Sequence, residues 1–353
     1  MNQTAHLKET RRSGAKPMTS KTKSLLITAL AAAFVGPAPI GAQTPAAPGV
    51  YQYVVRQAEG TVDSVAAAIA AAAPGAGFQL LAMVPVGTPA GCSYKASVVA
   101  LYAPDYGREI VTANRRTGPF AVVDRVNVFA DEKGVHVSVV NPRSILRTTL
   151  MDDQKHTALI ESHLGTLRKM VSEAVKGTAS AQDYGQRREH GYIGKTMGVM
   201  AGGPFSEKVT DLTLVEGDWK SAASRVRSGL EKIGPAWGLR LAYALEIPEA
   251  ETFILGTTGS PMDSKSFEIV GAGADETRDN LKCPGLAHAG AYPIEVVVAK
   301  DAKGAVVRLV ASMYRMKMFF EDAGKWAFMK NMGMPGSIQD EIAAQVKAGI
   351  ASR

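Results

Sequence analysis

The chain has 353 residues, 46% of them hydrophobic and 21% charged, an ordinary composition for a soluble globular protein of about two domains. Its formal net charge is +7, but residues 1–42 hold six basic residues against one acidic residue, and this +5 leaves only +2 for the rest of the chain. A balance this small excludes nucleic acid and anionic membrane surfaces as expected partners.

The first 42 residues have the features of an export signal. Lys21 and Lys23 precede an apolar run over 24–35, and helix-breaking and small residues follow up to Ala42. The run is short for a membrane span. We expect residues 1–42 to be a cleaved signal peptide, with an uncleaved anchor as the alternative. The mature protein is then periplasmic or secreted and has no membrane span.

Residues 51–177 predict a first α+β unit. A helix begins at Thr61, where Val62, Val65 and Ile69 form one apolar stripe. The other expected elements are strands over 51–57, 78–86 and 94–102, a short helix over 105–115, a hairpin that pairs 125–130 with 135–140, and a long helix over 151–176.

Residues 178–208 are polar and rich in glycine, and we expect a linker or a loop that lies over the domain junction. A second unit follows over 209–348. Its expected elements are strands over 212–215, 239–247 and 266–270, helices over 219–233, 275–281, 319–329 and 338–348, and a hairpin over 296–307.

The two units repeat each other at a constant offset of 170 residues. The clearest landmark is the hairpin, which covers 126–137 in the first unit and 296–307 in the second. A repeat of this length indicates two similar domains rather than a solenoid of short units. The element order β-α-β-β-α-β-β-α, present twice, predicts an α+β fold with mostly antiparallel sheets and helices on one face.

A Pro-led strand over 119–129, an acidic-x-Gly turn, a strand from Gly134 and the polar-Pro exit Asn141-Pro142 follow one another in the first unit. This order resembles the family catalogued as domain of unknown function 302. The second unit keeps Pro293 and the turn but has no polar-Pro exit. The resemblance implies this α+β fold and carries over no catalytic residues. It also implies that the tandem acts as a dimer within one chain, as a monomer or a loose oligomer.

The chain contains two cysteines, Cys92 and Cys283, at places that are not equivalent in the two units. An exported protein can join them in a disulfide, and two unreactive thiols or one reactive cysteine are the alternatives. Cys92 lies in a loop between two predicted strands with Lys95 nearby, and Cys283 can pair with His288 across a loop. Cys92, Cys283 and His288 are therefore the candidates for catalysis by a thiol.

Methionines are frequent in the second unit. They are Met313, Met316, Met318, Met329, Met332 and Met334. Thioether groups bind Cu(I), but the offset of 170 places Leu146 and Thr148 opposite Met316 and Met318, and a leucine-to-methionine exchange is typical of core packing. We therefore expect core packing or an apolar groove. The candidate ligand-binding residues are Met316, Met318, Met332 and Met334.

No metal site is expected from the sequence. Past the signal, no two histidines have the i, i+4 spacing of a helical zinc site, and there is no Cys-x-x-Cys motif. The glycine-rich segment 256–260 lacks the Gly-Lys-Ser/Thr ending of a phosphate-binding loop, and no Gly-x-Ser-x-Gly elbow is present. Zinc, nucleotide and α/β-hydrolase chemistry therefore have no motif in this chain.

These observations predict an exported, non-enzymatic protein that binds a small apolar ligand, with haem as one candidate, between sheet and helices or between the two units. Four aromatic residues of the second unit suit such a ligand: Phe319, Phe320, Trp326 and Phe328. The first alternative is an enzyme that uses Cys92, or Cys283 with His288. The second is an accessory module that binds another exported protein through a sheet edge. No cofactor is identified.

Overall fold

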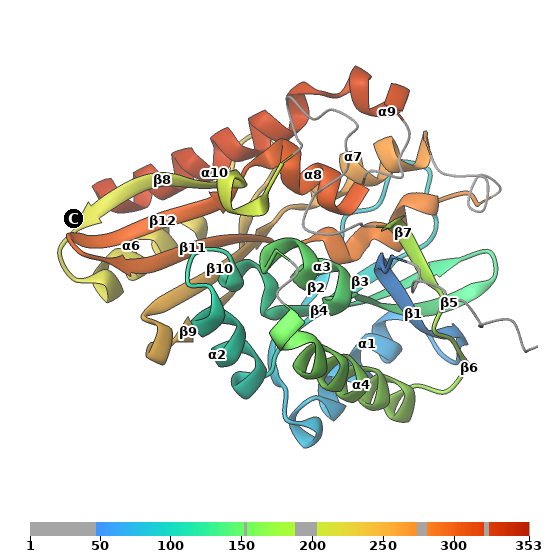
Figure 1. Ribbon diagram of the computed structural model, residues 1–353. Coiled ribbons are helices and arrows are strands. Elements are labelled where there is room, and N and C mark those ends of the chain that lie inside the picture. Colours follow the sequence, from blue (N-terminus) through green and yellow to red (C-terminus); the bar gives the residue numbers. More distant parts are fainter. Residues whose placement is uncertain (1–46, 152–153, 188–202, 274–280, 321–324, 353) are drawn as a thin grey trace, which may run out of the picture. The chain divides into compact units, whose positions relative to one another are not determined.

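The computed structural model describes residues 47–151, 154–187, 203–273, 281–320 and 325–352. The unit from Ala46 to Arg353 contains two antiparallel sheets with helices packed against them, so the predicted α+β class is confirmed (Figure 1). No helix in the described ranges combines the length and the apolar character needed to cross a membrane. The expected signal peptide, residues 1–42, lies outside the described residues.

The first sheet is built from the first half of the chain. Its strand order is β2 (Gln79–Pro85), β3 (Ala96–Tyr102), β4 (Val123–Asp131), β5 (Gly134–Val140), β1 (Gly49–Ala58) and β6 (Thr178–Ala179), and β7 (Asp183–Arg187) also pairs with β1. Its helices are α1 (Val62–Ala72), α2 (Pro104–Ala113), α3 (Pro142–Thr149) and α4 (Thr157–Ala174), with the short 3-10 turns η1 (Pro74–Ala76), η2 (Gly118–Ala121) and η3 (Gln154–His156). Helix α1 begins where predicted, because Thr61 and Ser64 form a reciprocal capping box.

The second sheet has the strand order β8 (Val209–Glu216), β12 (Gly304–Val310), β11 (Ile294–Asp301), β10 (Thr252–Thr258) and β9 (Arg240–Ile247). Its helices are α6 (Trp219–Leu230), α7 (Ser260–Gly271), α8 (Ser312–Phe320), α9 (Lys325–Lys330) and α10 (Gly333–Ala351), with the 3-10 turns η4 (Phe205–Lys208), η5 (Pro248–Ala250) and η6 (Pro284–Ala291). Counted within each half, the second, third, fourth, fifth and first strands lie side by side in both sheets.

The predicted hairpin is present in both halves. Strand β4 pairs with β5, and β11 pairs with β12. Each turn places an aspartate opposite a glycine, Asp131 with Gly134 and Asp301 with Gly304. The two glycines have φ angles of 123° and 147°. Glycine adopts such angles without the steric cost that a Cβ atom adds, which explains the shared turn sequence.

The predicted strand over 266–270 is wrong, because these residues belong to helix α7 and the strand at this place in the fold is β10. Buried Met262, Ser266 and Val270 recur every four residues, which is the spacing of a helix face, and Pro261 occupies the first turn. The predicted helix over 275–281 falls almost entirely on residues outside the described ranges.

Three other segments differ from expectation. The long helix predicted over 151–176 is shorter, because the 3-10 turn η3 precedes α4. The helix predicted over 319–329 corresponds to the end of α8 and to α9, and residues 321–324 between them are not described. The polar segment 178–208, predicted as a linker or a covering loop, supplies β6 and β7 to the first sheet. Their backbone pairing with β1 needs no apolar periodicity.

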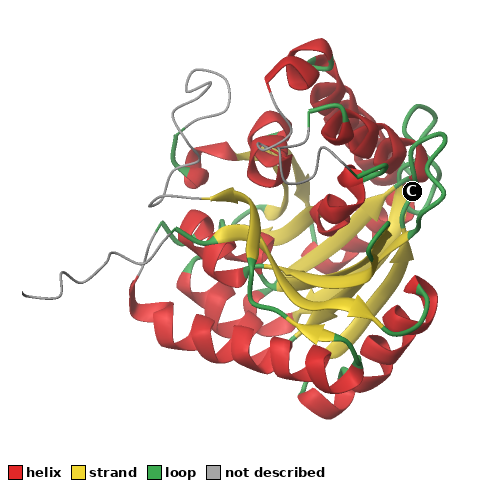
Figure 2. Cartoon of the chain, turned by 90° about the vertical axis from the view of Figure 1, so that its right-hand side faces the viewer, coloured by secondary structure: helices red, strands yellow, loops and turns green. Residues whose placement is uncertain are grey.

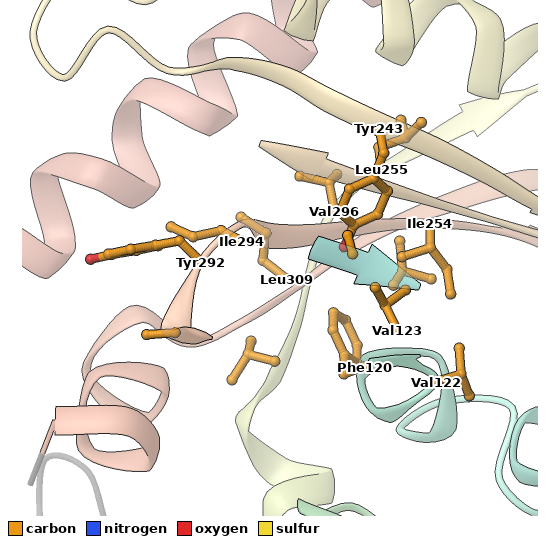
Figure 3. Close-up of a cluster of buried hydrophobic side chains, with 14 of the residues drawn as sticks. Phe120, Val122, Val123, Tyr243, Ile254, Leu255, Tyr292, Ile294, Val296 and Leu309 are labelled. Atoms are coloured by element: carbon orange, nitrogen blue, oxygen red, sulfur yellow. The ribbon is translucent and has the colours of Figure 1, made fainter. Parts of the chain in front are cut away.

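Helices cover one face of each sheet (Figure 2). Helices α1 and α4 contact the first sheet, and α6, which packs on α10, contacts the second. Apolar residues from both halves also form one continuous core. Figure 3 shows part of this core, with Phe120 and Val123 of the first half beside Tyr243, Leu255 and Val296 of the second. This shared core holds the two halves together and positions the polar groups described next.

Candidate functional site

A buried cluster of charged side chains lies where the two halves meet. Arg125 of β4, Glu295 of β11 and Arg315 of α8 are 2%, 5% and 6% exposed. Arg125 and Glu295 are separated by the repeat offset of 170 residues, so the same position of the two halves carries opposite charges that pair with each other. A buried charge is tolerated only when it is paired and hydrogen-bonded, so this cluster fixes how the halves face each other.

Glu295 contacts both guanidinium groups. Arg125 Nη1 donates to Glu295 Oε1 at 2.8 Å and to the carbonyl of Pro293 at 3.3 Å. Arg315 Nη2 lies 3.8 Å from Glu295 Oε2 and donates to the same carbonyl at 3.1 Å. Both guanidinium carbons lie over the Phe319 ring, 4.9 and 5.0 Å from its centroid. Burial lowers the pKa of Arg315, an effect that Glu295 opposes.

The 3-10 turn η6 of the second half packs on strand β4 of the first. Asn127 Nδ2 donates to the carbonyls of Leu286 and Ala287 at 3.3 and 3.1 Å, and the Tyr184 hydroxyl donates to Ala287 at 2.7 Å. The ring of His288 is fully buried, with its centroid 5.4 Å from that of Tyr51 and 5.9 Å from that of Phe320. The structure therefore places His288 in an aromatic part of the junction.

The two cysteines are joined. A disulfide links Cys92, in the loop between β2 and β3, to Cys283, at the start of η6, with 6.0 Å between their Cα atoms. Of the three alternatives that the sequence leaves open, the structure therefore shows the disulfide. Neither sulfur atom is a thiol in this state, so the thiol chemistry considered for Cys92, or for Cys283 with His288, requires reduction first.

The loop that carries Cys92 also docks on helix α7. The Gly87 amide donates to Asp263 Oδ2 at 3.2 Å, and the Ser264 hydroxyl donates to the carbonyl of Thr88 at 2.7 Å. A Cβ atom on Gly87 would lie 2.1 Å from the Ser260 carbonyl oxygen, so this close approach requires glycine. The first half contacts α7 in this way, and the second half contacts the corresponding helix α2 through η5.

Burial raises the pKa of Asp263 to about 7, although the Thr258 hydroxyl and the Gly87 amide, which donate to the carboxylate, oppose the rise. A raised pKa in the folded state means that stability is fully present below the unfolded pKa near 4 and declines as the pH rises to about 7. We expect this decline to reach about 4 kcal/mol for wild type and to disappear in Asp263→Asn, as measured by urea unfolding from pH 4 to pH 8.

The exposed acid Asp63 provides the matched control for that titration, since its carboxylate contacts only the surface residue Lys95 among the printed ion pairs. The Asp63→Asn variant is expected to keep the wild-type dependence of stability on pH. A wild-type protein whose stability is constant between pH 4 and pH 7 would contradict the assignment of the buried proton to Asp263.

The four candidate methionines do not share one environment. Met318 is 2% exposed and belongs to the core, whereas Met332 is 42% exposed. Met316 and Met334 are half-buried at the edge of the core. Of the aromatic residues expected around an apolar ligand, Phe319 and Phe320 are buried, Phe328 is half-buried and Trp326 is 75% exposed. This spread agrees better with core packing and surface positions than with one apolar pocket.

A surface groove lies between α2 and η3 in the first half. Its volume is about 560 Å³. The lining residues are Asp105, Arg108, Glu109, Thr112, Ala113, Lys155 and His156. Arg108 pairs with Asp105, and His156 Nδ1 lies 3.6 Å from Glu109 Oε1. Sequence reasoning missed this site, because a long helix was expected from residue 151 and the break at η3 is what presents Lys155 and His156 to α2.

The inner face of α2 is anchored by a buried polar contact. The Tyr106 ring stacks on the His163 ring at 3.6 Å between centroids, and His163 Nε2 lies 2.9 Å from Asp124 Oδ1. Burial raises the pKa of Tyr106, and the charge of Asp124 adds to this effect. The stack joins α2 to α4 and thus gives the groove a rigid wall. Among the described residues, no group of three or more His, Cys, Asp and Glu side chains is placed to hold a metal ion.

Comparisons with known proteins return little. No protein-family model matches the chain, and no curated protein matches it. One solved structure that aligns is the crystal structure of the uncharacterized conserved protein DUF302 from Bacillus stearothermophilus, with 11% sequence identity and a TM-score of 0.30. The alignment covers 35% of this chain and 98% of that chain. At this TM-score the likeness carries no argument about function.

Proposed function

We propose that the chain is an exported, non-enzymatic protein that binds a small polar solute in the groove between α2 and η3. The observation that carries this proposal is the groove of about 560 Å³, a volume within the range of about 300 to 1,000 Å³ that is usual for small-molecule sites. Its lining combines the basic side chains of Arg108 and Lys155 with the acidic side chains of Asp105 and Glu109. A solute with both a carboxylate and a cationic group matches these charges.

The same proposal treats the two halves as diverged copies of one domain, which together act as a dimer within a single chain. The identical order of elements and strands supports it, as does the pairing of Arg125 with Glu295 at the repeat offset. The groove belongs to one copy. In the other copy, the corresponding helix α7 is contacted by the loop that contains Gly87 and Thr88.

The charged lining narrows the ligand class. An apolar ligand or haem gains most from a pocket lined by apolar and aromatic side chains, whereas this groove presents four ionised groups, a hydroxyl and a histidine. The apolar side chains expected for such a ligand, among them Phe319 and Met318, are part of the core instead. A polar solute is therefore the better candidate.

The test uses the mature chain from about residue 43 and three probes, L-glutamate, L-arginine and glycine betaine. We expect at least one probe to raise the melting temperature and to bind in isothermal titration calorimetry. The Arg108→Ala variant should weaken that binding at least tenfold, about 1.4 kcal/mol, because it removes a charged contact to the solute.

A matched control is Arg143→Ala. Arg143 forms an exposed ion pair with Glu161 on another surface, just as Arg108 does with Asp105, so its loss should leave binding unchanged. Equal binding by Arg108→Ala and wild type would refute the groove as the site. If none of the three probes binds and native mass spectrometry of the purified protein shows only the bare chain, the ligand-binding proposal fails.

A further inference from the structure

Tyr243 extends toward the buried charge cluster because the strand beside it carries a glycine. Gly256 of β10 pairs with Tyr243 of β9 on one side and with Glu295 of β11 on the other, so the three residues form one row across the sheet. A Cβ atom on Gly256 would lie 2.3 Å from the Tyr243 ring, which therefore crosses over this glycine. Strands lie about 4.8 Å apart, so a tyrosine that crosses one strand brings its hydroxyl to the next.

Two hydrogen-bond donors near this point have no partner among the residues that the structure describes. They are the Tyr243 hydroxyl and Arg125 Nε, and both atoms are buried. Burial, followed by the charge of Glu295, raises the pKa of Tyr243, so the hydroxyl keeps its proton and can donate. An unpaired buried donor is costly, and two of them beside one carboxylate point to an acceptor that the chain itself does not supply.

The charges at the junction point to the nature of that acceptor. Arg125 and Arg315 both contact Glu295, so two positive groups share one negative group. Lys317, on the same helix as Arg315, is also buried. The buried acid Asp263 does not balance them, because it accepts from Thr258 and Gly87. The three contacting groups thus carry a net charge of +1 away from water, which a monovalent anion would neutralise.

We propose that the junction between the two halves binds a small monovalent anion of halide size, held by Arg125 Nε and the Tyr243 hydroxyl. Guanidinium and phenol groups donate without accepting when protonated in this arrangement, which suits a spherical anion better than a neutral molecule. Asn127 Oδ1, a buried acceptor without a partner among the described residues, lies two residues along β4 and provides a place for one accompanying water. This site is separate from the groove of the proposed function, so either can fail alone.

Bromide is the probe for this site, because its anomalous scattering distinguishes it from water. Crystals of the mature protein grown with sodium bromide should show an anomalous peak beside Arg125 and Tyr243. In solution, the melting temperature should rise with sodium bromide and with sodium chloride, compared with sodium gluconate at equal ionic strength. The Tyr243→Phe variant should weaken the bromide affinity about tenfold, since one hydrogen bond to the anion is lost.

Tyr292→Phe is the control, because its hydroxyl lies 2.6 Å from the Ser266 hydroxyl and is already used. This variant should keep the bromide response of wild type. Water without an anomalous peak at the junction would overturn the proposal. Bromide found at the surface alone, as an adventitious ion only, would overturn it too, and so would a bromide response that Tyr243→Phe leaves unchanged.

Discussion

Removal of the disulfide by the double change Cys92→Ser and Cys283→Ser is expected to lower the free energy of unfolding by about 3 to 5 kcal/mol. The bridge spans 191 residues of sequence, and the entropy that a cross-link removes from the unfolded chain grows with the length of the loop it closes. It also joins the two halves directly, through the loop that docks on α7. Guanidinium unfolding of wild type and the double variant, with equal slopes, measures this difference.

A reducing agent supplies the control for this expectation. It should destabilise wild type by a similar amount and leave the double serine variant unchanged, because only wild type has a bond to reduce. If reduction changes the midpoint of wild type by less than the experimental scatter, the disulfide does not stabilise the junction. A large effect of the reductant on the serine variant would show that the reagent acts on something other than this bond.

Local patterns explain why much of the fold follows from the sequence. The hairpin turns combine an aspartate, two polar residues and a glycine, and Gly134 and Gly304 both have the positive φ that this turn requires. The helix that begins at Thr61 has its capping box and its apolar stripe within a few residues. Such signals act over short distances, so one sequence is enough to read them.

Tertiary contacts explain the errors. Residues 266–270 are apolar enough to suggest a strand, but they lie in α7, whose buried face packs on η6. The segment that contains β6 and β7 has no apolar period, and its structure comes from pairing with β1. Propensity and periodicity do not contain these long-range contacts, and they override the local preference.

The candidate sites were harder to predict than the fold. The sequence identified both cysteines and left their pairing open, because their positions are not equivalent in the two units. It gave no reason to connect Arg125 with Arg315, since opposite charges on different elements meet only after the halves pack. The repeat offset does relate Arg125 to Glu295, so a comparison of charge at equivalent positions was the available signal for this pair.

Replacement of Glu295 by glutamine is expected to cost about 3 to 5 kcal/mol of folding stability, and more than Arg125→Met costs. Glu295→Gln leaves two buried guanidinium groups without a counter-charge, whereas Arg125→Met leaves the Glu295 and Arg315 charges balanced. Urea unfolding of the two variants measures the difference. Exposed Glu161→Gln, which breaks the pair with Arg143, should cost less than about 1 kcal/mol. Equal losses for Glu295→Gln and Arg125→Met would mean that packing, rather than the charge balance at the junction, determines what these residues contribute.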